Sequence, residues 1–139
     1  MVRRLVKLLL KKISARGWII AWVFWVIVLC VLSSLPQNKV HLPPFPNSDK
    51  VAHFFYFAAG AGLFAAFLRV LGSPAWQTFL ITLLAMAFVG AADEFHQLYT
   101  PGRSGADIGD WTADVSGAFL GILLTLFIFR NSGKSKKEN

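Results

Sequence analysis

The chain has 139 residues, of which 55% are hydrophobic, and its formal net charge is +7. This length allows one domain, and the apolar content places it among membrane proteins. The basic residues lie mainly in segments that flank long apolar runs, which indicates membrane topology and excludes nucleic acid as the expected partner. The single cysteine, Cys30, lies in an apolar run and excludes an intrachain disulfide or a site of several thiolates.

A basic segment begins the chain. Residues 1–16, MVRRLVKLLLKKISAR, carry six positive charges with Leu and Val between them. The segment has the composition of a signal-peptide start, but the apolar run after it ends in SSLP, without a small-residue cleavage site. The pattern predicts a retained first span. We expect residues 1–16 either to lie on an anionic leaflet as an amphipathic helix or to be the ordinary positive charge that flanks a span on its cytoplasmic side.

Four apolar runs are long enough to cross a membrane. The first, 17–35, has 19 residues without a charge, and at about 1.5 Å per residue it covers roughly the 30 Å hydrocarbon core. A Gly-Ser-Pro turn at 72–74 predicts a tight antiparallel hairpin, and four prolines make 36–48 an extended loop. The sequence predicts an all-α polytopic membrane bundle of four transmembrane helices, at about 17–35, 51–71, 75–92 and 111–129.

The distribution of basic residues predicts the orientation. With a cytoplasmic N-terminus, four spans place 11 of the 14 lysines and arginines inside and only Lys39, Lys50 and Arg103 outside. Cytoplasmic loops are enriched in positive charge, so we expect both termini in the cytoplasm and the loops around 36–50 and 93–110 on the outer face. Residues 131–139 are typical of a basic disordered tail.

Five of the seven acidic residues lie in one stretch, 91–114, which reads AADEFHQLYTPGRSGADIGDWTAD. Its last three aspartates lie at i, i+3 and i+7, on a helix face that continues into Gly117 and Gly121. A carboxylate that faces lipid is costly, so this face is expected to turn toward the bundle. Glycines four residues apart allow a neighbouring helix to approach closely, which predicts helix packing or a homo-oligomer through Gly117 and Gly121.

The predicted topology places the candidate site residues near the same outer face. Ionisable groups at the rim of apolar helices must find partners, and such groups are functional by default. The candidate catalytic residues are His53, Glu94 and Asp93, the candidate ligand-binding residues are Lys50, Arg103, Gln97 and Tyr56, and the candidate metal ligands are Asp107, Asp110 and His96.

Three chemical uses of this cluster stay open. Carboxylates and imidazoles are suitable ligands for a divalent metal, although no HExxH-like spacing is present. A histidine oriented by a carboxylate can transfer protons while Arg103 holds a phosphate oxygen. The cluster can also bind a polar head group without a reaction. The structural alternative is a satisfied polar network that only orients the helices.

The ordered set of motifs resembles the VanZ-like family of bacterial membrane proteins over about residues 20–125. One departure is Asp114, which stands where asparagine is expected in many members. The residues that carry the resemblance are Ser33-Ser34-x-Pro36, Asp49-Lys50-x-x-His53-x-x-Tyr56, Asp93-Glu94-x-His96-Gln97, Pro101-Gly102-Arg103 and Asp107-x-x-Asp110-x-x-x-Asp114-x-x-Gly117-x-x-x-Gly121.

The resemblance implies a VanZ-like membrane domain over 17–130 and a role in the bacterial cell envelope. The family takes its name from a member associated with teicoplanin resistance. The resemblance therefore implies a plasma-membrane protein with a role related to glycopeptide action or to surface polymers. Our leading hypothesis is a protein that binds the anionic head group of a lipid or a lipid-linked cell-wall precursor, with modification of that head group left open. The alternative is a non-enzymatic membrane scaffold whose polar network is structural.

Overall fold

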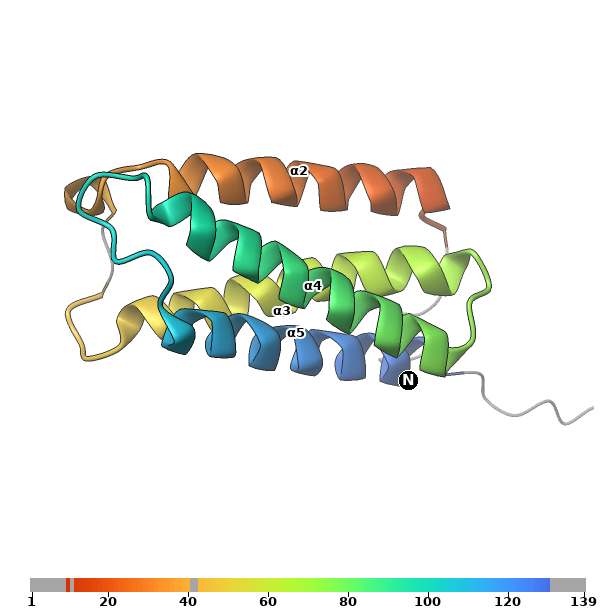
Figure 1. The fold of residues 1–139 in the computed structure, drawn as a ribbon. Helices are drawn as coiled ribbons and strands as arrows, with labels where there is room; N and C mark the ends of the chain where they lie inside the picture. Colours follow the sequence, from red (N-terminus) through yellow and green to blue (C-terminus); the bar gives the residue numbers. More distant parts are fainter. Residues whose placement is uncertain (1–9, 11, 41–42, 131–139) are drawn as a thin grey trace, which may run out of the picture.

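The computed structural model describes residues 10, 12–40 and 43–130, in which four long helices alternate in direction (Figure 1). Each of the four is long and apolar enough to cross a membrane, which confirms the predicted all-α membrane bundle. Residues 1–9 and 11 of the predicted basic segment, 1–16, and the predicted tail, at 131–139, lie outside the described residues. The elements are α2 (Ala15–Ser33), η1 (Gln37–Lys39), α3 (Ser48–Val70), α4 (Ala75–Gln97) and α5 (Ile108–Phe129).

Three helices extend beyond the predicted spans into polar sequence. Helix α3 begins at Ser48 rather than 51, α4 continues to Gln97 rather than 92, and α5 begins at Ile108 rather than 111. A hydropathy pattern ends where polar residues begin, whereas a helix continues as long as its polar side chains find partners. Gln97 illustrates this, since its Nε2 atom donates a hydrogen bond to Asp93 Oδ2 at 2.8 Å, one turn earlier. The candidate site residues therefore lie mostly on helices.

Helices α3 and α5 form the most extensive contact in the bundle. Gly117 and Gly121 lie so close to the α3 backbone, at Phe54 and Ala58, that a Cβ atom at either glycine would collide with an α3 carbonyl oxygen. Small residues allow this approach of two helix backbones. The glycine pair therefore packs within the chain. A homo-oligomer through these two glycines, which the sequence suggested, would need the face that α3 already covers.

Apolar side chains lie both in the core of the bundle and on its outer faces. Phe57, Met86 and Ile122 are fully buried in the core between the helices. Large apolar side chains such as Leu84 and Phe88 are exposed on the outer faces. Exposed apolar side chains are what helices that face lipid carry. The polar side chains gather elsewhere, at one end.

Helix α2 is joined to α3 by a reciprocal pair of hydrogen bonds. Trp25 Nε1 donates to the carbonyl oxygen of Tyr56 at 3.1 Å, and the Tyr56 hydroxyl donates to the carbonyl oxygen of Trp25 at 2.9 Å. The two rings stack with their centroids 4.9 Å apart. The Trp25 ring also lies directly on Gly60, where a Cβ atom would collide with it.

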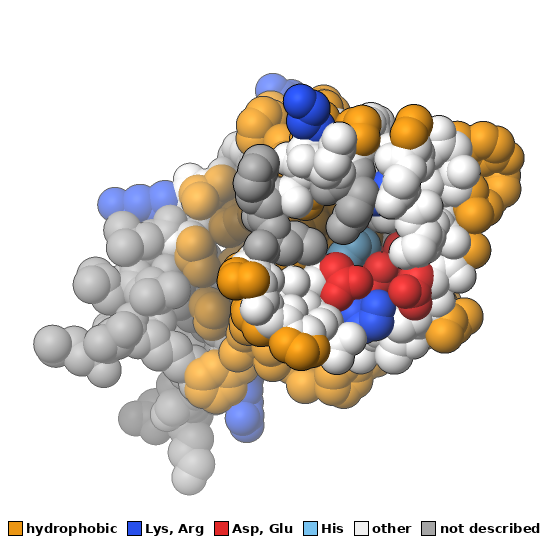
Figure 2. Space-filling view, turned by 90° about the vertical axis from the view of Figure 1, so that its left-hand side faces the viewer, with side chains coloured by type: hydrophobic (Ala, Val, Ile, Leu, Met, Phe, Trp, Pro, Cys, Tyr) orange, Lys and Arg blue, Asp and Glu red, His pale blue; other side chains and the backbone are white. Residues whose placement is uncertain are grey.

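One end of the bundle, here named the polar end, is where α2 and α4 end and α3 and α5 begin (Figure 1). The opposite end holds the short turn from α3 to α4, in which Gly72 has a φ of 92°, a value that favours glycine. Figure 2 faces the polar end and shows acidic side chains gathered around a basic one, next to a hollow. The candidate site lies at this end.

Candidate functional site

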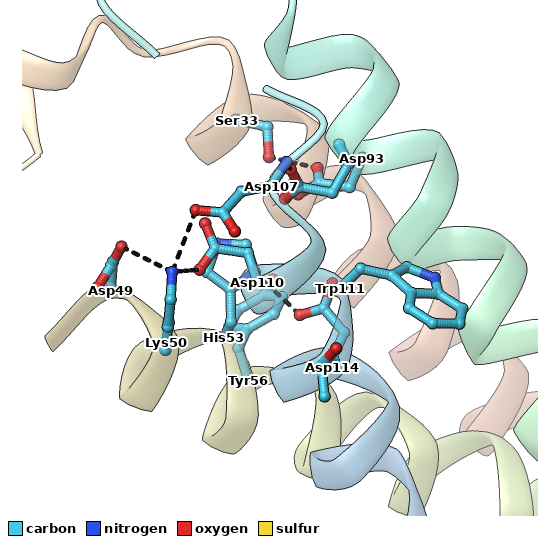
Figure 3. A network of polar contacts seen from close by, with 12 residues as sticks. Ser33, Asp49, Lys50, His53, Tyr56, Asp93, Asp107, Asp110, Trp111 and Asp114 are labelled. Atoms are coloured by element: carbon cyan, nitrogen blue, oxygen red, sulfur yellow. Dashed lines mark hydrogen bonds and ion pairs between the residues drawn. The ribbon is translucent and has the colours of Figure 1, made fainter. Parts of the chain in front are cut away.

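Lys50, in the first turn of α3, lies among three carboxylates (Figure 3). Its Nζ atom is 3.6 Å from Asp49 Oδ2, 3.2 Å from Asp107 Oδ2 and 2.9 Å from Asp110 Oδ1. These ion pairs join the start of α3 to the start of α5. Because three anionic groups already surround Lys50, the geometry disfavours the phosphate contact that the sequence suggested for this lysine.

Asp107 also begins α5 as its N-cap. Its Oδ1 atom accepts a hydrogen bond from the backbone N–H of Gly109 at 2.7 Å, a position in which a short acidic side chain stabilises a helix start. This hydrogen bond, together with the Lys50 ammonium, lowers the pKa of Asp107 below its ordinary value. Asp107 is therefore a carboxylate with a structural task at the rim of the site.

His53 and Asp114 form a second contact between α3 and α5, deeper in the bundle. His53 Nδ1 lies 2.9 Å from Asp114 Oδ1, and Asp114 is completely buried. When Nδ1 donates its proton to this carboxylate, the lone pair of the imidazole lies on Nε2. Nε2 can then accept a proton or bind a cation. Asp114 Oδ2 has no hydrogen-bond partner in the described part of the chain.

Asp93 joins α4 to the end of α2. Ser33 Oγ donates a hydrogen bond to Asp93 Oδ1, and Gln97 Nε2 donates to Asp93 Oδ2. All three side chains are buried. The carbonyl oxygen of Ser33 in turn accepts a hydrogen bond from Thr100 Oγ1 at 2.9 Å. The predicted catalytic and ligand-binding residues Asp93 and Gln97 thus meet a partner, Ser33, that was not among the candidate residues.

Glu94 holds the loop that leads into α5. Its Oε2 atom accepts a hydrogen bond from the backbone N–H of Asp107 at 2.8 Å, and its carbonyl oxygen accepts one from Ala106 at 3.2 Å. Ala106 has a φ of 62°, in the left-handed region. Glu94 is 4% exposed, and its Oε1 atom finds no hydrogen-bond partner among the residues that the structure describes. One buried carboxylate oxygen is thus left for another partner.

His53, Asp93 and Glu94 come together as a group that could hold a metal. Each offers one ligand atom, and these atoms all lie within 4.8 Å of one another; no other such group of three exists in the described part of the chain. The ligands suggested by the sequence have other partners. Asp107 and Asp110 bind Lys50. The third, a histidine, turns toward α2.

That histidine, His96, and Arg103 both contact the end of α2. His96 Nε2 lies 3.2 Å from Ser34 Oγ. Arg103 donates from Nε to the carbonyl oxygen of Leu35 at 3.2 Å and from Nη2 to that of Leu32 at 3.0 Å. The last carbonyls of a helix lack intrahelical partners, and a basic side chain near the C-terminus satisfies them. Arg103 therefore holds the end of α2. The phosphate contact that the sequence suggested for it stays a prediction.

A pocket of about 250 Å³ lies between α2, α3 and α4 near the polar end. Leu29, Leu32 and Phe57 contribute to its apolar wall. Polar side chains gather in the same pocket, and five of them are candidate site residues. The polar and titratable lining residues are Ser33, Asp49, His53, Tyr56, Asp93, Gln97 and Arg103.

A comparison with protein families identifies the family of the chain. A family model described as VanZ/LLP1 matches residues 14–130, which include all four long helices and every residue of the polar network. Searches of curated proteins and of solved structures found no match. The matched region is most of the chain, and its four helices are each able to span a membrane. The chain therefore belongs to the VanZ/LLP1 family and is a multi-pass membrane protein.

Proposed function

We propose that this chain is a cell-envelope protein that binds the polar head group of a lipid or of a lipid-linked cell-wall precursor. The observation that carries the proposal is the lining of the pocket, where an apolar wall meets a small set of placed polar groups. Ligand pockets combine these two features. An apolar wall suits the first carbons of a lipid chain, and the polar groups suit hydroxyl, amide or phosphate groups.

The distribution of charge supports an outward-facing polar end. Placing 11 of the 14 basic residues on the cytoplasmic side follows the positive-inside rule and puts both termini in the cytoplasm. The pocket then opens among the head groups of the outer leaflet. An outward-facing pocket is in line with the role in glycopeptide action or surface polymers that the VanZ resemblance implies.

Within the pocket, Arg103 is the group suited to a phosphate. Two of its N–H groups hold the carbonyl of Leu32 in α2 and that of Leu35 just beyond it, and a guanidinium has five donors in all. The remaining donors are available to an anionic oxygen. Ser33, Asp93 and Gln97 already bind one another, and they supply acceptors and donors for the hydroxyl or amide groups of a head group.

His53 can serve a bound head group in one of two ways. Its Nδ1 atom is held by Asp114, and an imidazole oriented by a carboxylate is an arrangement used for proton transfer. The same orientation is used when the other ring nitrogen binds a cation. Proton transfer would make the protein an enzyme that modifies the head group, whereas cation binding alone would make it a binding protein.

Native mass spectrometry of the gently extracted protein tests the proposal. We expect the wild-type chain to retain an anionic lipid or precursor, and we expect Arg103→Gln to lose it while its side-chain amide still reaches a carbonyl of α2. Lys39→Ala is the matched control, because it removes an exposed positive charge near the same end without touching the pocket. Equal retention by wild type and Arg103→Gln would contradict the assignment of Arg103.

The structural alternative has its own supporting observation. Ser33, Thr100 and Arg103 form the contacts that hold the end of α2 to the α4–α5 region, so the network could serve packing alone. Replacing His53 or Glu94 by glutamine separates the two readings. Head-group binding predicts that these variants reach normal membrane levels but lose the envelope phenotype, such as a change in glycopeptide sensitivity. Variants that disappear from the membrane favour the scaffold.

A further inference from the structure

We propose that His53, Asp93 and Glu94 form a binding site for a divalent transition-metal cation of the zinc or manganese type. The three side chains come from facing helices, α3 and α4, and their ligand atoms all lie within 4.8 Å of one another. Two ligands bound to one zinc ion at about 2.0–2.1 Å lie about 3.4 Å apart in tetrahedral geometry. Small side-chain rotations therefore bring the three atoms to a shared ion.

The balance of buried charge requires a cation or protons at this position. Asp93 and Glu94 are 5% and 4% exposed, and Asp114 is fully buried. Buried carboxylates are stable only when they are paired, protonated or bound to a metal. Lys50 is already held by carboxylates at the rim. In the described part of the chain, this leaves His53 as the partner of the deeper acids, and a divalent cation supplies the missing positive charge.

An unpartnered oxygen points to a ligand independently of the acidic cluster. Glu94 Oε1 is buried and accepts no hydrogen bond from the described residues, while Oε2 of the same carboxylate is held by the Asp107 backbone. Buried polar atoms without a partner are rare in native proteins and call for an unseen ion or water. The carboxylate is thus fixed by one oxygen and offers the other to a cation.

His53 is held as metal-binding histidines are. Such a histidine commonly donates its second ring N–H to a carboxylate, which fixes the tautomer and the orientation of the ring. Asp114 Oδ1, at 2.9 Å from Nδ1, is placed for this role, and the ligand is then Nε2. A donor set of one imidazole and two carboxylates suits zinc or manganese better than calcium or magnesium, which prefer oxygen alone.

The cation would also explain how an acidic site holds an anionic ligand. Three protein ligands leave a coordination position open, and His53 and Asp93 both line the pocket. A phosphate oxygen of the head group takes this position, so that the metal bridges the carboxylates and the phosphate. This last step rests on the proposed function, whereas the cation site itself does not.

Metal binding is tested on the full-length protein in detergent, after removal of any histidine tag and stripping with EDTA. ZnCl₂ or MnCl₂ is then added alone, and bound metal per chain is measured by plasma mass spectrometry after gel filtration, together with the melting temperature. We expect one equivalent of one of these ions and a melting temperature that rises with the free metal concentration. No bound metal and an unchanged melting temperature would overturn the site.

Variants locate the ion. We expect Glu94→Gln and His53→Gln to abolish stoichiometric binding, and Asp114→Asn to weaken it by about 10–100-fold, as loss of an outer partner does. Asp107→Asn, which removes a partly exposed acid at the same end, is expected to bind as wild type does. Equal binding by all four variants would overturn the site. If Glu94→Gln does not fold, the metal titration of the wild type and the binding by Asp114→Asn still decide whether the cation site exists.

The cation site and the head-group proposal fail separately. Zinc or manganese binding without a retained lipid or precursor in native mass spectrometry would uphold the site and contradict the head-group proposal. Retained lipid in a chain that binds neither metal would do the reverse. Retention that EDTA abolishes and added metal restores would support the bridge between them.

Discussion

His53 Nδ1 lies 2.9 Å from Asp114 Oδ1, and this contact joins α3 to α5 across the interior of the polar end. Asp114 stands where the family resemblance leads us to expect asparagine. Asparagine would keep a carbonyl oxygen that accepts from Nδ1 but would lose the negative charge. The two residue types therefore conserve the orientation of His53 and differ in the charge beside it.

We accordingly predict that Asp114→Ala destabilises the fold far more than Asp114→Asn. Alanine leaves the His53 N–H without its partner, and an unsatisfied buried donor costs about 1–3 kcal/mol. The melting temperature of both purified variants, measured in EDTA so that no metal contributes, checks this. An alanine variant as stable as wild type would show that the contact contributes nothing to packing.

A second prediction concerns the glycines between α5 and α3. Gly121→Ala is expected to destabilise the protein by about 1–3 kcal/mol, the usual cost of overpacking, because the new Cβ meets the carbonyl of Ala58. Gly62→Ala is the control, since its nearest neighbour is Thr125 Oγ1 at an ordinary 3.5 Å. The control is expected to stay within about 1 kcal/mol of wild type. Thermal unfolding in detergent measures both, and equal effects would contradict the helix contact.

The reciprocal bonds of Trp25 and Tyr56 predict a loss of stability in Tyr56→Phe. Removing the hydroxyl breaks its bond to the Trp25 carbonyl, which corresponds to about 0.5–1.5 kcal/mol. Tyr99→Phe is matched, because Tyr99 is the other tyrosine and is 74% exposed. It should change stability by less than about 0.5 kcal/mol. Similar melting temperatures for the two variants would refute this role of Tyr56.

Asp107 predicts a dependence of stability on pH. The Gly109 N–H and Lys50 hold its pKa below the ordinary 3.8, so its ionised form favours the folded state. That contribution is complete above the unfolded value and is lost as the pH falls through the folded one. Asp107→Asn keeps a good N-cap but lacks the charge. It should melt below wild type at pH 7, with a gap that closes below pH 3.8, and a gap independent of pH would contradict the ion pair.

The fold followed from the sequence more completely than the site did. Long apolar runs and a Gly-Ser-Pro turn define four spans, because burial in lipid demands apolar residues and internally satisfied backbone. The helix ends were missed at Asp93 and Gln97, since composition cannot tell a polar loop from a polar last turn. The contact between those two side chains is local and could be read from their spacing of four residues.

The partners of the site residues could not be predicted in the same way. Ser33 and Asp93 lie 60 residues apart, and His53 and Asp114 lie 61 apart. Which side chains meet depends on how each helix is rotated about its axis, and that rotation is set by glycine contacts and core packing rather than by hydropathy. The candidate metal ligands Asp107 and Asp110 lie at one helix start, and the sequence did not indicate that Lys50 would contact both.

The clamp on α2 has a consequence for biosynthesis. The first span leaves the ribosome early, yet its partners lie much later in the chain. Trp25 contacts Tyr56, 31 residues on, and Ser33 contacts Asp93, 60 residues on. Arg103 follows its acceptors Leu35 and Leu32 by 68 and 71 residues. None of the last three can form until the third span has been made. Helix α2, the first of the four described spans to be made, is thus among the last to be docked, and the pocket exists only once synthesis has passed Arg103.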